Sequence, residues 1–275
     1  MVLTESIFYK KIEDLKDVEE VVAFQEKIWS SDTVTPLPQL VAACHNGGIL
    51  MGAFDDSHLV GFCYGFPGFK NHETYLISHM AGVLPAYHNR GIGEQLKLKQ
   101  REWALEYGYK KMVWTYDPLE ARNAYFNLNK LGAYAKTYIY SYYGEMTDKL
   151  NKGLPTDRLL AEWDLASERA VQTLAGSRQQ EGQQYESLIE TTMVNGFPHP
   201  VEQKERGREK GYLVPIPAHF QDMKKADLET AKLWRRKAGN VLAAALADGY
   251  VVTALLRNIS DQVHAYVIEK MEVSS

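Results

Sequence analysis

Hydrophobic residues recur along the first half of the chain with the two spacings that distinguish helices from strands. A stripe at Val18, Val21, Val22, Ile28 and Trp29 predicts a helix over residues 14–29. The same reasoning predicts helices over residues 36–44, 91–107 and 119–131, and strands over residues 7–12, 49–54, 59–66, 73–84, 111–116 and 137–146. The order β-α-α-β-β-β-α-β-α-β predicts an α/β domain with an α+β mixed sheet.

The second half of the chain predicts a smaller α+β region. Its pattern predicts a helix over residues 226–246 and strands over residues 157–165, 212–220, 250–257 and 263–270, the last two as a hairpin. Pro215 and Pro217 restrict the strand that holds them to an edge of a sheet. Residues 167–210 are rich in Gln, Glu, Arg and Gly and predict a polar excursion. We therefore predict two domains, residues 1–150 and 151–275, the second echoing the start of the first.

Composition sets limits on the class of protein. Hydrophobic residues make up 45% of the 275 residues, enough for a sizeable core. The 31 basic and 35 acidic side chains give a net charge of −4, which argues against nucleic acid as a partner. The sequence has no run of about 18 apolar residues and no apolar signal core near its start, so we expect no membrane contact. Cys44 and Cys63 are expected to be reduced thiols, as in a cytoplasmic protein.

The stretch from Met80 to Glu94, MAGVLPAYHNRGIGE, joins a predicted strand to a predicted helix through a glycine turn. The first backbone N–H groups of a helix have no partner inside it and carry partial positive charge. Gly91 and Gly93 let an anion approach those groups, so the stretch predicts a phosphate cradle. Glu94 and Gln95 stand where a P-loop has Lys and Ser or Thr, and a third glycine of the dinucleotide fingerprint is missing. A turn with only a structural role is the alternative.

The same stretch resembles motif A of the GNAT acetyltransferases, a strand ending in Val-x-Pro followed by Gln/Arg-x-x-Gly-x-Gly/Ala. Here Val83-Leu84-Pro85 precedes His88-Asn89-Arg90-Gly91-Ile92-Gly93, with His88 in the place of Gln or Arg. The predicted order of elements is similar to the GNAT fold over about residues 5–147. Residues 123–127 resemble a bacterial subgroup of GNAT-like proteins with a long C-terminal extension.

This resemblance implies a set of ligands for acetyl-CoA, or for another acyl-CoA, and no metal. The turn is expected to hold the pyrophosphate, the end of the strand to hold the pantetheine arm in a gap between two splayed strands, and an Asn of the later helix to bind the arm. The residues concerned are Ala81, Gly82, Val83, His88, Asn89, Arg90, Gly91, Ile92, Gly93, Glu94 and Asn123.

The catalytic side chains depart from the family pattern. Ile77 replaces a strand Glu that serves as base in several members, and His79, two residues on, is our candidate base. Its alternative is a core histidine bonded to a backbone carbonyl, and a bulge in the strand would change its direction. Leu128 replaces the Tyr that protonates the thiolate in the family. Tyr125 is a candidate substitute or a packing aromatic, and in the second case water would protonate the thiolate, since the low pKa of a thiol makes the acid dispensable. Asp117 is expected to cap the helix that follows it, or to face the acceptor.

Together these features predict an acyl-CoA-dependent N-acyltransferase that moves an acetyl group directly to a small-molecule amine. The alternative is a GNAT-like module that binds or senses an acyl-CoA without turnover. Two further groups leave their roles open. The tyrosines 138, 140, 142 and 143 line either a hydrophobic acceptor pocket or the face of a homodimer. The cationic run Lys232, Arg235, Arg236 and Lys237 is expected to be a solvated helix face, or else to recruit an acidic substrate.

Overall fold

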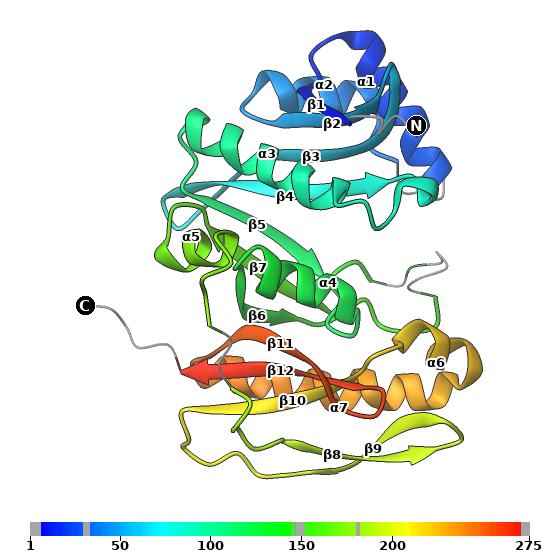
Figure 1. Ribbon diagram of the computed structural model, residues 1–275, viewed down its shortest axis with the longest axis vertical. Helices are drawn as coiled ribbons and strands as arrows, with labels where there is room; N and C mark the ends of the chain where they lie inside the picture. The colour runs from blue at the N-terminus through cyan, green and yellow to red at the C-terminus, as the bar shows by residue number, and fades with distance from the viewer. Residues whose placement is uncertain (1–6, 30–33, 145, 147–151, 180–181, 271–275) are drawn as a thin grey trace, which may run out of the picture. The chain divides into compact units, whose positions relative to one another are not determined.

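A mixed sheet organises the first part of the chain in the computed structural model, which describes residues 7–29, 34–144, 146, 152–179 and 182–270 (Figure 1). The chain divides into two units, which we describe separately. Unit 1 comprises residues 1–114 and 164–166, and unit 2 comprises residues 115–163 and 167–275. The predicted division at residue 150 stays a prediction.

Unit 1 contains the predicted strands and helices in the predicted order. They are β1 (Phe8–Lys11), α1 (Leu15–Ile28), α2 (Leu37–His45), β2 (Ile49–Asp55), β3 (His58–Lys70), β4 (Glu73–Val83), α3 (Ile92–Tyr107) and the first four residues of β5 (Lys111–Tyr116). Strands β1 to β4 pair antiparallel in chain order, and β5 pairs parallel to β4. The mixed sheet of the predicted α/β class is thereby confirmed.

Helices cover both faces of the sheet of unit 1. Phe62 and Tyr64 of β3 belong to a buried apolar cluster with residues of α1 and α2, including Phe24 and Leu40. Cys63, between them, points to the opposite face, because neighbouring residues of a strand alternate in direction. Its thiol lies 3.6 Å from the backbone carbonyl oxygen of Leu96 in α3. The polar site described below is built where α3 meets β4.

Unit 2 contains the remaining strands and helices of the chain. After the end of β5 it contains α4 (Ala121–Tyr125), a π turn (Phe126–Lys130), β6 (Tyr134–Ile139), β7 (Arg158–Asp164), α5 (Glu168–Leu174), β8 (Ile189–Val194), β9 (Phe197–Gln203), β10 (Gly211–Pro217), α6 (Phe220–Ala226), α7 (Leu228–Ala247), β11 (Tyr250–Ser260) and β12 (Val263–Lys270). The strands are ordered β7-β6-β11-β12-β10, and β8 and β9 form a separate pair. Strand β10 is an edge strand, as its two prolines predict.

The predicted echo between the two halves holds for the order of elements but not for strand pairing. The order β10-α6-α7-β11-β12 repeats β1-α1-α2-β2-β3. However, β1 pairs with β2, whereas β10 pairs with β12.

The predicted polar excursion over residues 167–210 contains a helix and two strands that the sequence analysis did not predict. That segment contains α5, capped by a hydrogen bond of 3.2 Å from the Ala170 amide to the Ser167 hydroxyl, and the β8–β9 hairpin. Asn195 and Gly196 make the hairpin turn with φ of +50° and +81°. An Asn-Gly pair is the strongest short hairpin signal in a sequence, and it was present here.

Two predicted boundaries near the middle of the chain also need correction. The predicted strand over residues 137–146 ends at Ile139, because the Asp157 carboxylate accepts the Ser141 amide at 2.9 Å and draws it out of the ladder; residue 145 lies outside the described residues. The predicted helix over residues 119–131 begins at Ala121, with Glu120 rather than Asp117 at its N-cap, and its last turn is a π turn.

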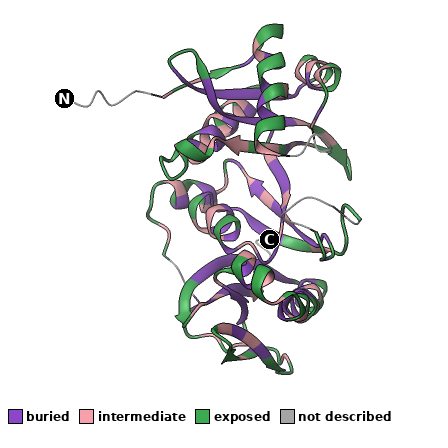
Figure 2. Ribbon diagram, turned by 90° about the vertical axis from the view of Figure 1, so that its right-hand side faces the viewer, coloured by how far each residue is buried: buried purple, intermediate pink, exposed green. Residues whose placement is uncertain are grey.

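Burial follows the strands, several of which contain long buried runs (Figure 2). Both cysteines are free thiols, Cys63 buried and Cys44 half-buried. Across the described residues, no helix has the length and apolarity needed to cross a membrane.

Candidate functional site

The turn before α3 presents backbone rather than side chains to a ligand. Gly91, at the N-cap of α3, has φ of +77°, a left-handed conformation that glycine adopts without strain. A Cβ at Gly91 would meet nothing within 4 Å, and one at Gly93 would meet only Val83 Cγ2, at 4.0 Å. The space in front of the first helical turn is therefore open, as a phosphate cradle requires.

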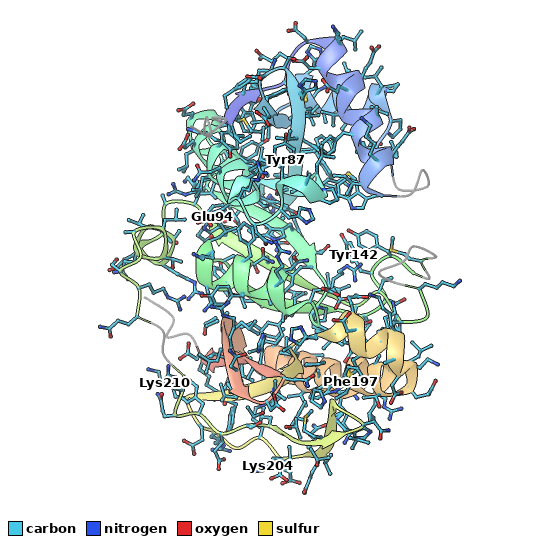
Figure 3. The ribbon with its side chains drawn as sticks, turned by 45° about the vertical axis from the view of Figure 1, so that its right-hand side comes forward. Tyr87, Glu94, Tyr142, Phe197, Lys204 and Lys210 are labelled. Carbon is cyan, nitrogen blue, oxygen red and sulfur yellow. The ribbon has the colours of Figure 1, made fainter. Side chains whose placement is uncertain are left out.

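The side chains of the turn are held back against the strand. The His88 ring nitrogen Nε2 lies 2.9 Å from the Val83 carbonyl oxygen. The Tyr87 hydroxyl donates to the Asp55 carboxylate at 2.6 Å, and the Arg90 guanidinium lies 4.8 Å from the centre of the Tyr87 ring. Figure 3 labels Tyr87 before the turn and Glu94 in the first turn of α3. These contacts hold the side chains of Tyr87, His88 and Arg90 in place beside the turn.

His79 is the bulged residue of β4. Tyr64 of β3 pairs with Met80 and Gly65 pairs with Ser78, so His79 is left without a partner in the ladder. The imidazole lies 5.5 Å from the Phe66 ring and 6.2 Å from the Tyr64 ring, on the face that α1 and α2 cover. Among the described residues no carbonyl accepts a hydrogen bond from this ring, and the residue is exposed. The packed rings limit its hydration, which lowers the pKa of His79 below its usual value and favours the neutral base.

The pairing between β4 and β5 is short. It consists of Leu76 with Met112 and Ile77 with Val113, after which β4 continues to Val83. From Ser78 onward, no strand among the described residues pairs with the edge of β4 that faces β5. Such an edge can accept an extended ligand by backbone hydrogen bonds.

A buried polar network that the sequence analysis missed lies beneath this edge. The Lys97 ammonium donates to the Ser78 hydroxyl at 2.6 Å, and that hydroxyl donates to Gln100 Oε1 at 2.6 Å. The ammonium also lies 3.7 Å from the centre of the Trp114 ring. Burial lowers the pKa of Lys97 to about 7 and raises the pKa of the neighbouring Cys63 thiol to about 12. The signal available in the sequence was a lysine and a glutamine on the face of α3 that also carries Ile92, Leu96 and Ala104.

The remaining predicted site residues belong to unit 2. Asn123 is exposed on α4. Tyr125 is half-buried, with the Arg257 guanidinium 4.1 Å from its ring centre, which is the packing alternative for this residue. Leu128, in the place of the family's tyrosine, is completely buried.

Asp117 is held in a buried ion pair. Its carboxylate accepts hydrogen bonds from Arg235 Nη1 at 2.8 Å and Nη2 at 2.6 Å, and from the Leu119 amide at 2.8 Å. Arg158 lies 3.8 Å from the same carboxylate. The prediction that Arg235 belongs to a solvated cationic face is therefore wrong, since Arg235 is only 4% exposed. The four tyrosines 138, 140, 142 and 143 also differ in their surroundings. The Tyr138 hydroxyl donates to the Asp157 carboxylate at 2.7 Å, while Tyr140, Tyr142 and Tyr143 are exposed.

Two open pockets, of about 510 and 380 Å³, lie in unit 2 away from every predicted site residue. No group of three or more His, Cys, Asp and Glu side chains in the described part of the chain is arranged to hold a metal ion.

The fold and the site together define a class of protein: a mixed α/β domain with an open glycine turn between β4 and α3. Residues 15–132 match the model of the acetyltransferase (GNAT) family, and this segment contains α1 to α4 with the whole turn. This segment, rather than the whole chain, is assigned to the GNAT superfamily of acetyltransferases. No curated protein matches the chain.

Solved structures of GNAT proteins are similar in fold to part of the chain. A GNAT acetyltransferase from Streptococcus pneumoniae is 16% identical, with 57% of this chain and 98% of that chain covered and a TM-score of 0.47. Arabidopsis thaliana Naa50, in complex with the bisubstrate analogue CoA-Ac-MVNAL, is 16% identical, with 57% and 97% covered and a TM-score of 0.45. A GNAT acetyltransferase from Elizabethkingia anophelis with acetyl-CoA bound is 17% identical, with 58% and 99% covered and a TM-score of 0.42. The family assignment rests on the family model alone.

Proposed function

We propose that the chain transfers an acetyl group from acetyl-CoA directly to a small-molecule amine. The observation that carries this proposal is the left-handed Gly91 at the open start of α3, beside the end of β4. The amides of residues 91–94 would bind the pyrophosphate, with Arg90 as a nearby cation. The backbone of Ala81, Gly82 and Val83 would bind the pantetheine arm.

His79 is the proposed base. Its ring has a lowered pKa and no hydrogen-bond partner among the described residues, so it can accept a proton from an incoming ammonium group. A backbone donor of β4 aimed at the thioester oxygen would stabilise the developing negative charge. Asn123, Tyr125 and Asp117 lie in unit 2, and the proposal does not depend on them.

Replacement of Gly91 by valine tests the cradle. Valine at a left-handed position is strained by about 1–2 kcal/mol and places a side chain in front of the amides. Gly108, at the other end of α3, is the matched control, because it has φ of +107° and equally open surroundings. We expect Gly91→Val to abolish the thermal shift that acetyl-CoA produces, and Gly108→Val to keep it. An unchanged shift in Gly91→Val, or an equal loss in both variants, would contradict the cradle.

An acceptor screen tests turnover. Purified protein is incubated with acetyl-CoA and panels of small amines, and release of the free CoA thiol is measured. With a working amine, His79→Gln should lower kcat by about 10²-fold or more, whereas His45→Gln, at an exposed histidine of α2, should not. If His79→Gln kept the kcat of the wild type, the assignment of His79 as the base would be wrong.

A second candidate is a module that binds an acyl-CoA without turnover. The observation in its favour is that the fully buried Leu128 stands where the family pattern has a tyrosine, and that Tyr125 is engaged with Arg257. Binding of acetyl-CoA without acetylation of any amine in the screen would favour this candidate. A homodimer and a cytoplasmic location stay predictions.

A further inference from the structure

Lys97 is a buried cation without an acidic partner. It is 5% exposed, and in the described part of the chain no carboxylate forms an ion pair with it. Its contacts are the Ser78 hydroxyl and the face of the Trp114 ring. Removing a charge from water without a counter-charge costs several kcal/mol. Natural proteins keep such destabilising groups mainly where function uses them. The position of Lys97 in the fold therefore indicates which function it has.

The ammonium marks the point where β4 and β5 cease to pair. The last pair is Ile77 with Val113. Ser78 and Trp114 are the next residues of the two strands, and Lys97 contacts both of them from α3. Beyond this point no described strand pairs with this edge of β4, so a ligand can bind along it.

Coenzyme A is long enough to reach from the glycine turn to this point. This step rests on the proposed function. About a dozen bonds join the pyrophosphate to the sulfur, which equals the backbone of four extended residues, or roughly 14 Å. The turn lies beside Val83, since the His88 ring contacts the Val83 carbonyl and a Cβ at Gly93 would lie 4.0 Å from Val83 Cγ2. Four residues back along β4 from Val83 is His79, next to Ser78. A pantetheine arm that follows the free edge therefore brings its sulfur level with the Lys97 ammonium.

His79 and Lys97 then flank the thioester from opposite faces of the sheet. The His79 ring lies on the face covered by α1 and α2, whereas the Ser78 side chain and Lys97 lie on the face covered by α3. The arrangement separates a group that accepts a proton from a group that donates one.

We propose that Lys97 is the catalytic residue that protonates the sulfur of coenzyme A as the thioester breaks. The amine nitrogen forms a bond to the acetyl carbon, and the carbon–sulfur bond breaks with its electron pair going to sulfur. The proton that the amine loses goes to His79, and a proton of the Lys97 ammonium goes to sulfur. The products are the amide, the free thiol and a neutral Lys97, which regains a proton from solvent as His79 releases one.

The surroundings suit this role. The pKa of Lys97, near 7, makes its ammonium a stronger acid than an ordinary lysine and well matched to a thiolate. Cys63 of β3 is the titratable group that acts on Lys97, and the raised pKa of its thiol keeps it neutral. Ser78, Gln100 and Trp114 carry no charge. Gln100 Nε2 is buried without a partner among the described residues, so the network has an unused donor as well.

The test measures the pKa of the CoA thiol while CoA is bound. Thiolate absorbance is titrated in the protein–CoA complex, and the same titration with desulfo-CoA, which lacks the thiol, is subtracted. In the wild-type chain the Lys97 ammonium and the bound thiol should titrate as a coupled pair, so part of the thiolate signal should appear with the first proton that the pair loses, near the pKa of Lys97 and below that of free CoA. Lys97→Met should remove this early part of the signal and raise the apparent pKa of the bound thiol by about one unit or more, a tenfold loss of thiolate. Lys99→Met removes an exposed charge from the same helix and should have no effect.

Ser78→Ala separates charge from local disturbance. This variant removes the hydroxyl that holds Lys97 but keeps the cation, so the bound thiol should stay acidic. In turnover, Lys97→Met should lower kcat about tenfold or more at an acetyl-CoA KM within about twofold of the wild type. The proposal would be overturned by equal thiol pKa values in the wild type and Lys97→Met. It would also be overturned if Ser78→Ala changed the thiol pKa as much as Lys97→Met does, or if Lys97→Met left kcat unchanged. If the wild type binds CoA with a Lys97-dependent thiol pKa but acetylates no amine, the proposed function fails while the position of the ammonium is supported.

Discussion

Replacing Lys97 by methionine should stabilise the fold, and by an amount that depends on pH. The pKa of Lys97 falls from 10.5 to about 7 on folding. At 1.36 kcal/mol for each pKa unit, this difference corresponds to a penalty of roughly 5 kcal/mol for burying the charge. Methionine has nearly the same length and no charge, so it removes the penalty with little change in packing.

The sign of the pH dependence follows from the protons bound in each state. Below pH 7, Lys97 is charged in both the folded and the unfolded chain, and the full penalty applies. Between pH 7 and about 10.5 the unfolded chain binds the additional proton, so the stability of the wild type rises with pH. Lys97→Met should therefore exceed the wild type by roughly 3–5 kcal/mol at pH 6, and by less at each higher pH.

Urea unfolding at pH 6 and pH 9.5, followed by tryptophan fluorescence and far-UV circular dichroism, measures this difference. Lys99→Met is the control, because Lys99 forms an exposed pair with Glu102 and should change the free energy of unfolding by less than about 1 kcal/mol at either pH. A loss of stability in Lys97→Met at pH 6, or the same gain at both pH values, would refute the reasoning that Lys97 is a desolvated cation.

Three further predictions concern other parts of the chain. Asp117→Asn should cost roughly 3–5 kcal/mol in urea unfolding, because it leaves the guanidinium of Arg235 buried without its carboxylate; a double replacement of both by apolar residues should cost much less, and equal costs would contradict this account. The pH profile of kcat/KM should rise through a pKa below 6.5, since desolvation lowers the pKa of His79 and its neutral form persists at lower pH; a profile that is unchanged in His79→Gln would exclude it. A thiol reagent followed by mass spectrometry should label the half-buried Cys44 in the folded protein and label Cys63 only after unfolding; early labelling of Cys63 would show that its side of β3 opens in the native state.

Local patterns determined most of the fold of unit 1. The spacing of apolar residues, the prolines and the glycines predicted α1, α3 and β5 to within a few residues. The Gly91 turn was readable because its chemistry depends on neighbouring backbone atoms, which a short stretch of sequence specifies. The structure places the start of α3 at Gly91, as the turn predicted, while the binding of a phosphate there stays a prediction.

The errors arose where a side chain from a distant part of the chain decides a local structure. Asp117 has the sequence context of a helix cap, yet Arg235, more than a hundred residues later, binds its carboxylate. Asp157 likewise ends β6 early by taking the Ser141 amide. The hairpin of β8 and β9 was missed for another reason, since its Asn-Gly signal was hidden by the polar composition around it.

The sequence by itself determined the strand, glycine turn and helix start in which we propose that a coenzyme A pyrophosphate binds, because these three parts are contiguous in it. Only the tertiary structure decided which side chains lie beside the rest of the arm. The bulge turned His79 toward the face of α1 and α2, and the packing of α3 on β4 placed Lys97 between Ser78 and Trp114. The physical reason is that desolvation depends on everything packed around a group: the same lysine would be an ordinary surface cation if the adjoining face of α3 met water instead of the sheet.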